Sequence, residues 1–445
     1  MKDAGVIELA LGALRRAGCE GEVFLERSRS TRVVVSGGTV EALEVREDRG
    51  AGIRTFQGGR AGFSFTADLS PQGIETAVSR AVEISAVVGS DPASRLPGDP
   101  GPPAEGLRLF DASLADVPVA RKIEMAMASE ESARGADRRV SGVRESAYED
   151  FTSLRRVANT SGLDTSFQRS RAVVSIELAA TESGESQLGW HAEWRVGVED
   201  LDPVAVALEA VRKATVKLGA SPARTRRTAV LLTPDVTASL LGALSSLFSA
   251  DAVLKGKSLM AGKVGQPVAA ETVSLVDDGR HPEGYASGPV DGEGVAARET
   301  TLIEGGILLG YLQSAYTAHR MGTSLTGNAL RPDYTSRPRI GPTNLHLRPS
   351  DTPPDELLRG VTEGVCVMEV MGLHTIDSAS GDFSLGASGL TVESGRLSRP
   401  VDRMAIAGNI ISLLSSIKVV ASDLQFLIHG PGSTVLLQDM AVSGK

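Results

Sequence analysis

A proline-rich stretch near residue 100 limits how this chain can fold more than any other feature. Residues 90–106 contain five prolines, at positions 92, 97, 100, 102 and 103. Proline lacks the N–H that helices and central strands require, so such a stretch indicates a linker. The polar run Ser221–Arg227 marks a second boundary, and 445 residues are too many for one ordinary core. The predicted organisation is an N-terminal domain over 1–89, a linker over 90–114, a middle domain over 115–220 and a C-terminal domain over 226–445.

Local patterns within these segments predict an α+β fold. Glycine pairs between short apolar runs predict hairpins at Gly37-Gly38 and Gly58-Gly59. A capping residue followed by proline predicts helices that begin at Ser70-Pro71, Asp202-Pro203 and Thr233-Pro234. Apolar residues at helical spacing over 7–17 and 115–134 predict two more helices, and alternation over Val174–Ala180 predicts a strand.

The C-terminal half is predicted to be rich in strands and turns. A strand over Ala229–Leu232 precedes the helix at Thr233-Pro234, and short helices are expected near Pro354–Gly360 and Ile406–Ile417. The 49 glycines and 21 prolines of the chain favour many tight turns. The fold class is therefore predicted as an N-terminal helix–sheet–helix domain, a middle α+β segment and a β-rich C-terminal domain with a few helices.

Composition argues against several functional classes. The net charge is −9 and no run of Lys and Arg is visible, which disfavours nucleic-acid binding. Cys19 and Cys366 cannot make a disulfide framework or a metal site. The start at Met1 has no apolar leader pattern, and no apolar run approaches the length of a membrane span. We expect a cytoplasmic protein that does not bind membranes.

Most catalytic motifs fail when each is compared with its full pattern. Gly256-Lys257-Ser258 resembles a phosphate loop, but Asp251 stands where the first glycine is needed. Ser415–Lys418 fits S-x-x-K without the accompanying motifs, so an exposed helix turn is the better interpretation. None of the six histidines is followed by glutamate, and Trp190–Trp194, with His191 and Glu193, is interpreted as an interface or lining surface.

Two further segments allow more than one interpretation. Asp277, Asp278, Asp291 and Glu293 could hold Mg²⁺ or Ca²⁺, although a solvated, turn-capping role fits their spacing better. The glycine-rich stretch over 380–389 could let a peptide approach the backbone closely, or could be a tight turn between two strands. Composition alone favours the turn.

The order of several short motifs resembles the TldD/PmbA family, once described as modulators of DNA gyrase. The matching segments run over nearly the whole chain: Glu47–Arg54, Gly59–Gly62, Asp68–Ser70, Ser258–Gly265, Val290–Val295, Leu302–Leu308, Thr326–Asn328, Gly381–Ser384, Ala387–Gly389 and Ile406–Asn409. The resemblance implies a metalloprotease in which a catalytic TldD-type subunit pairs with a TldE (PmbA)-type subunit around an enclosed cavity.

The same resemblance implies where zinc binds in the catalytic subunits. Their H-E-x-x-x-H motif follows the strand that matches Ala229–Leu232, and the counterparts of its two histidines and glutamate are Gly242, Leu247 and Ala243. Near the C-terminus a cysteine ligand is expected, but Leu427–Ser433 offers only His429. The chain therefore resembles the TldE-like class, with no catalytic residue, metal or cofactor of its own and with zinc expected in the partner subunit.

The favoured hypothesis is a non-catalytic subunit that shapes the chamber and holds unfolded peptide for a TldD-like metalloprotease partner. The candidate peptide-contacting residues are Gly381, Asp382, Phe383, Ser384, Ala387, Ser388 and Gly389. One alternative is a self-sufficient homodimeric hydrolase with an unrecognised site. Another is a non-enzymatic regulator that binds gyrase or another protein. A homodimer of the isolated chain is compatible with each of these hypotheses.

Overall fold

The computed structural model describes residues 3–444. Its first half is built on one six-stranded antiparallel sheet in the order β3-β2-β1-β4-β5-β6. Its strands are β1 (Glu20–Ser36), β2 (Thr39–Gln57), β3 (Arg60–Thr66), β4 (Val140–Asn159), β5 (Asp164–Glu182) and β6 (Glu185–Arg195). As the sequence predicts, hairpins at Gly37-Gly38 and Gly58-Gly59 join the first three strands.

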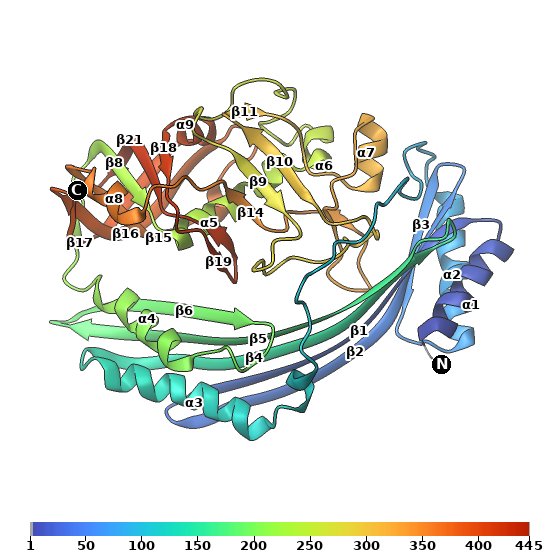
Figure 1. The fold of residues 1–445 in the computed structure, drawn as a ribbon, viewed down its shortest axis with the longest axis horizontal. Coiled ribbons are helices and arrows are strands. Elements are labelled where there is room, and N and C mark those ends of the chain that lie inside the picture. Colours follow the sequence, from blue (N-terminus) through green and yellow to red (C-terminus); the bar gives the residue numbers. More distant parts are fainter. Residues whose placement is uncertain (1–2, 445) are drawn as a thin grey trace.

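Four helices cover the outer face of this sheet (Figure 1). They are α1 (Asp3–Arg16), α2 (Pro71–Val87), α3 (Val119–Ala136) and α4 (Pro203–Thr215). Two of the three predicted caps are confirmed: Ser70 accepts a hydrogen bond from Gly73 N–H, and Asp202 accepts from the N–H groups of Val204 and Ala205. Thr233 begins its helix without a side-chain capping bond. Alternate residues of the strands, such as Val23 and Val174, pack under the helices, so the other face of the sheet turns towards the C-terminal half.

The segments predicted as separate N-terminal and middle domains share this sheet. β1 and β4 are hydrogen-bonded neighbours from Glu22↔Asn159 to Val35↔Ser146. The proline-rich segment between them lies against the C-terminal half, where Ala104 N–H donates to Pro289 O and Ala296 N–H donates to Pro100 O. Two apolar clusters lie on the sheet, one packed with α1 and α2 and the other with α3 and α4, so the predicted N-terminal and middle segments have separate cores on a shared sheet.

The C-terminal half contains a seven-stranded mixed sheet in the order β18-β21-β8-β15-β16-β17-β7. Its strands are β7 (Ser221–Pro222), β8 (Arg226–Leu232), β15 (Glu363–Met371), β16 (Asp382–Glu393), β17 (Arg396–Asn409), β18 (Ile417–Val420) and β21 (Val435–Ser443). Because β17 also pairs with β21, the strands β21, β8, β15, β16 and β17 close into a ring. The largest apolar core of the described residues includes side chains from this ring.

Shorter elements complete the C-terminal half. A four-stranded sheet has the order β11-β10-β9-β14, and two strand pairs are β12-β13 and β19-β20. These strands are β9 (Leu275–Asp278), β10 (Glu299–Glu304), β11 (Ile307–Leu308), β12 (Ala329–Leu330), β13 (Arg339–Ile340), β14 (Leu345–Leu347), β19 (Gln425–Leu427) and β20 (Gly430–Gly432). The helices are α5 (Pro234–Leu244), α6 (Ala250–Leu254), α7 (Ala315–Met321), α8 (Pro354–Arg359) and α9 (Ile410–Ser415).

A buried ion network joins the two halves. Glu22 of β1 pairs with Arg54 of β2 at 2.6 Å and with Arg331 of the C-terminal half at 2.8 Å, and Arg54 also pairs with Glu293 at 2.8 Å. The Glu22 and Arg331 side chains are fully buried. Among residues 3–444, no helix combines the length and apolar character that a bilayer span requires.

Candidate functional site

Helix α5 occupies the place where the family resemblance puts a zinc motif, and it carries no ligand there. Strand β8 leads into Thr233-Pro234, which begins the helix as predicted. Gly242 is exposed near the helix end, and Ala243 is half-buried. Leu247 is 1% exposed and packs in the C-terminal core. None of the three side chains has a donor atom for a metal or a base for activating water, so these residues do not fit zinc.

The C-terminal counterpart segment does meet this helix. The hairpin of β19 and β20 packs on α5 so closely that a Cβ on Gly432 would lie 2.1 Å from the Pro234 carbonyl oxygen. His429, in the turn of that hairpin, places Nε2 3.3 Å from the carbonyl oxygen of Asp235. Gly242 lies seven residues farther along, about 10 Å along the axis. The hairpin and helix come together as the resemblance implies, but His429 sits at the first turn of α5, away from the motif positions.

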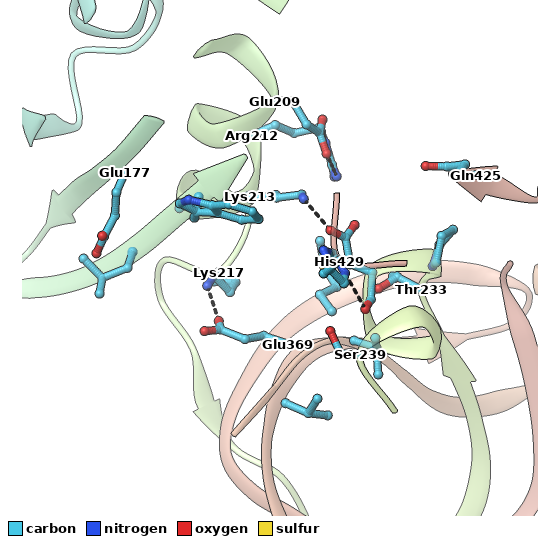
Figure 2. Close-up of a pocket in the computed structure, with 18 residues that line it drawn as sticks. Glu177, Glu209, Arg212, Lys213, Lys217, Thr233, Ser239, Glu369, Gln425 and His429 are labelled. Carbon is cyan, nitrogen blue, oxygen red and sulfur yellow. Dashed lines mark hydrogen bonds and ion pairs between the residues drawn. The ribbon is translucent and has the colours of Figure 1, made fainter. Parts of the chain in front are cut away.

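A cavity of about 580 Å³ opens beside the first turn of α5. Figure 2 shows it between α4 and the large sheet on one side and the C-terminal half on the other. The residues lining the cavity come from both halves of the chain: Glu177, Leu188, Gly189, Trp190, Glu209, Arg212, Lys213, Lys217, Thr233, Pro234, Asp235, Val236, Ser239, Met368, Glu369, Val370, Gln425 and His429. We call this space the α5 cavity.

The charges of the α5 cavity are largely paired. Lys213 Nζ lies 3.1 Å from Asp235 Oδ1, and Lys217 Nζ lies 2.6 Å from Glu369 Oε2. Burial opposes ionisation of Glu209, but hydrogen bonding and charge from Arg212 lower the pKa of that carboxyl below its ordinary value. Within residues 3–444, no three His, Cys, Asp or Glu side chains converge as a metal site would require. The arrangement offers an aromatic ring and alternating charges for binding.

The predicted peptide-contacting segment lies on strand β16, close to this cavity. Over Gly386–Gly389 the strand pairs with β15 on one side and β17 on the other, so it has no free edge for main-chain addition there. A peptide contact at Ala387, Ser388 and Gly389 could therefore involve side chains but not strand addition. Asp382–Leu385 pairs in register only with β17, and Phe383 is buried while Asp382 and Ser384 are exposed.

Strand β16 contacts the cavity through one side chain. Ser388 Oγ lies 3.4 Å from Glu369 Oε2, which lines the α5 cavity. Gly381 precedes the strand with a φ of +81°, in the left-handed region that favours glycine. The glycine-rich stretch is therefore mostly a paired strand entered by a turn.

Within the acidic group, Asp277 and Glu293 are buried, whereas Asp278 and Asp291 are partly buried. Asp277 accepts hydrogen bonds from Asn328 and Thr343, and burial raises its pKa to about 6. Asp291 caps a turn by accepting from the N–H groups of Glu293 and Val295, and burial raises its pKa to about 7. The turn-capping interpretation is confirmed for Asp291, whereas Asp277 and Glu293 are not solvated because both are buried.

The structure supports some of the remaining motif interpretations and contradicts others. Ser258 is buried and donates to Leu247 O, which leaves its hydroxyl engaged in the core. Ser415 ends α9 while Lys418 lies on β18, so the predicted helix turn does not carry both residues. Trp190 lines the α5 cavity and Trp194 Nε1 donates to Phe426 O of the C-terminal half, which confirms the lining and interface interpretation of Trp190–Trp194.

Several residues of the α5 cavity carried no signal in the sequence. Lys213 and Lys217 belong to α4 and the loop after it, whereas Asp235 and Glu369 come from later elements. A four-residue spacing on an amphipathic helix is typical of solvent-facing lysines, so nothing local distinguished this pair. Their carboxylate partners become visible only in the folded chain.

Known protein families and relatives match this chain over most of its length. Family models described as PmbA/TldA metallopeptidase domain 1, central domain and C-terminal domain match residues 21–85, 112–218 and 225–444. The Metalloprotease PmbA of Escherichia coli O157:H7 is 26% identical, covering 99% of this chain and 94% of the relative. A Metalloprotease TldD homolog of Haemophilus influenzae is 27% identical, covering 90% of this chain and 85% of the relative.

Solved structures share the fold. A Thermotoga maritima protein described as a modulator of a DNA gyrase has a TM-score of 0.91 and 26% identity, covering 99% of this chain and 100% of its own. TldE from Thermococcus kodakarensis has a TM-score of 0.88 at 23% identity, covering 98% of this chain and 100% of its own, which shows a common fold. Since the three domain models follow one another in order along the chain, this protein belongs to the PmbA/TldD metallopeptidase family.

Proposed function

We propose that this chain is the non-catalytic, PmbA/TldE-like subunit of a two-component metalloprotease, and that it holds unfolded peptide for a zinc-bearing TldD-like partner. The observation that carries the proposal is at the end of helix α5, where Gly242 and Ala243, with Leu247 in the short 3-10 helix that follows, stand at the motif positions. Losing one ligand would weaken a metal site, whereas losing both imidazoles and the base together removes the chemistry.

The α5 cavity supports the peptide-holding part of the proposal. It lies against the helix that carries zinc in catalytic relatives, and its volume of about 580 Å³ suits several residues of an extended chain. Trp190 supplies an apolar surface, while the Lys213–Asp235 and Lys217–Glu369 pairs can exchange partners with a peptide main chain or side chain. The proposed contact therefore centres on the α5 cavity, with Ser388 of strand β16 beside its Glu369.

The proposed setting is a reducing cytoplasm. Cys19 and Cys366 are both unpaired and buried. Burial raises the pKa of each thiol, so both behave as inert core residues. Nothing about them calls for an oxidising compartment.

Reconstitution tests the proposal directly. The purified chain is mixed with a zinc-bearing TldD-type chain from the same organism, and hydrolysis of an unfolded peptide is followed with zinc measured on each chain separately. We expect cleavage only when both are present, a mixed complex on size exclusion, and less than stoichiometric zinc on this chain alone. Stoichiometric zinc with peptide cleavage by the isolated chain would instead show the self-sufficient homodimeric hydrolase.

Filling the α5 cavity tests where the peptide is held. Ser239 lies on α5 and lines the cavity, so Ser239→Trp should block peptide while leaving the partner's zinc intact. The matched control is Ser246→Trp, because Ser246 is exposed beyond the end of α5 and does not line the cavity. We expect the KM of the complex to rise at least about tenfold for Ser239→Trp and to stay unchanged for the control. Equal activity of both variants would place the peptide elsewhere.

A further inference from the structure

Another, partly open cavity lies between the large sheet and the loops of the C-terminal half. It has a volume of about 330 Å³ and is lined by five arginines: Arg155, Arg169, Arg171, Arg331 and Arg339. We call it the arginine cavity. Its residues are separate from those of the α5 cavity.

Strand alternation directs two of these arginines into the space. On β5, Ala172 and Val174 are buried under the helices, so Phe167, Arg169 and Arg171 belong to the opposite face, which turns towards the C-terminal half. Residues two apart on a strand are about 7 Å apart, so these two guanidinium groups are held side by side. An aromatic contact also holds the guanidinium group of Arg171, whose Cζ lies 3.7 Å from the centroid of the Tyr285 ring.

Carboxylates pair with two of the five arginines. Arg155 pairs with Glu26 and Arg331 pairs with Glu22, each at 2.8 Å. Among the described residues, Arg169, Arg171 and Arg339 make no ion pair.

Arg169 and Arg171 each donate to one backbone carbonyl oxygen, which does not use all of their N–H groups. Arg169 Nη2 donates to Ser287 O and Arg171 Nη2 donates to Tyr285 O. The carboxylate that lines the cavity, Asp291, accepts from three backbone N–H groups and makes no bond to an arginine.

Several guanidinium N–H groups are buried without a partner. They are Nε of Arg169, and Nε and Nη1 of Arg331, whose side chain is fully buried. A buried donor that loses water and gains no acceptor costs about 1–3 kcal/mol, and more when it is charged. Burial, together with the neighbouring charges of Arg171 and Arg155, lowers the pKa of Arg169. The cluster therefore contains repelling cations with unused donors, which an anion would satisfy.

We propose that the arginine cavity is a binding site for an oxyanion, the carboxylate or phosphate group of a small molecule. Guanidinium groups match both anions in bidentate geometry, and the volume is that of a small-ligand site. The site takes its arginines from β4, β5 and the C-terminal loops, so a bound anion would also tie the two halves together. The proposal does not depend on the proteolytic role of the chain.

Titration of the full chain with inorganic phosphate tests the proposal. Binding is measured by calorimetry in chloride buffer at constant ionic strength, beside an acetylated dipeptide with a free C-terminal carboxylate and its C-terminal amide. We expect saturable binding of phosphate, of the free carboxylate, or of both, and none of the amide. The arm that binds more tightly identifies the anion. Absence of saturable binding in both anion arms would overturn the proposal.

Variants decide whether the arginines are responsible. Arg169→Met combined with Arg171→Met should abolish binding, and Arg339→Met, which changes an exposed side chain at the cavity margin, should weaken it about tenfold. The control is Arg399→Met, because Arg399 is exposed and paired with Glu393. If the double variant does not fold, Arg339→Met gives the answer. Binding unaffected by Arg339→Met, or equally weakened by Arg399→Met, would refute the site.

Discussion

The ion network between the two halves allows a quantitative prediction. Glu22 holds two arginines at once, Arg54 at 2.6 Å and Arg331 at 2.8 Å, and its side chain is fully buried. Burial opposes its ionisation, but the charges of Arg54 and Arg331 outweigh burial and lower its pKa. In Glu22→Gln, Arg54 keeps Glu293, whereas Arg331 is left buried with no carboxylate.

The expected cost follows from that uncompensated charge. Removing one partner of a buried ion pair typically costs about 3–5 kcal/mol, while replacing both partners by apolar residues is often neutral. We therefore expect Glu22→Gln to lower the free energy of unfolding by about 3–5 kcal/mol. The double variant Glu22→Met, Arg331→Met should recover most of this loss, since Arg54 and Glu293 still neutralise each other.

Urea unfolding followed by tryptophan fluorescence measures both variants. Trp194 reports on the junction because its Nε1 donates to Phe426 O across the two halves. Glu47→Gln is the control, since Glu47 faces Arg29 at 3.7 Å in an exposed pair and should change stability by less than about 1 kcal/mol. The network does not hold the halves together if Glu22→Gln lowers the free energy of unfolding by less than about 1 kcal/mol, or if the double variant is less stable than the single variant.

Three further predictions concern single residues. Burial raises the pKa of Asp277 to about 6, so between pH 3.8 and 6 the folded chain keeps a proton that the unfolded chain releases. The free energy of unfolding should therefore fall as the pH rises through this range. Asp277→Asn should remove that pH dependence, as measured by urea unfolding. Gly432→Ala should cost about 1–3 kcal/mol, because its Cβ would lie 2.1 Å from Pro234 O, and an unchanged thermal midpoint would contradict the packing. Gly242→Ala should stabilise the protein by about 0.5–1 kcal/mol and raise the thermal midpoint, because Gly242 is helical and nothing lies within 4 Å of an added Cβ. A lower midpoint would mean that this position requires glycine.

Local signals in the sequence predicted where elements begin. Caps at Ser70 and Asp202 specify helix starts by side-chain hydrogen bonds within three residues, so they can be recognised without the fold. The helix expected over Ile406–Ile417 is shorter, because β17 continues to Asn409 and only Ile410–Ser415 is helical. Ala405–Ala407 pair with β16 and β21, and this tertiary pairing overrides the apolar helical pattern.

The candidate site was predictable in part. Gly242, Ala243 and Leu247 were found through the family resemblance, because the motif positions follow strand β8 within one short stretch: Gly242 and Ala243 are near the end of α5, and Leu247 lies in the 3-10 helix that comes next. The arginine cavity was not, since the sequence shows no run of basic residues and its arginines come from β4, β5 and C-terminal segments more than 150 residues later. Long-range register brings them together, and residue spacing does not encode it.

The pairing of β1 with β4 also sets the order in which the chain can mature. At about 5–20 residues per second, a ribosome needs on the order of ten seconds to make the residues between these strands. During that interval β1 has β2 beside it but no neighbour on its other edge, where β4 later adds Ser146–Asn159. A nascent fragment that stops before residue 140 should therefore expose the unpaired edge of β1 to chaperones. Amide exchange on ribosome-stalled chains should detect this unpaired edge.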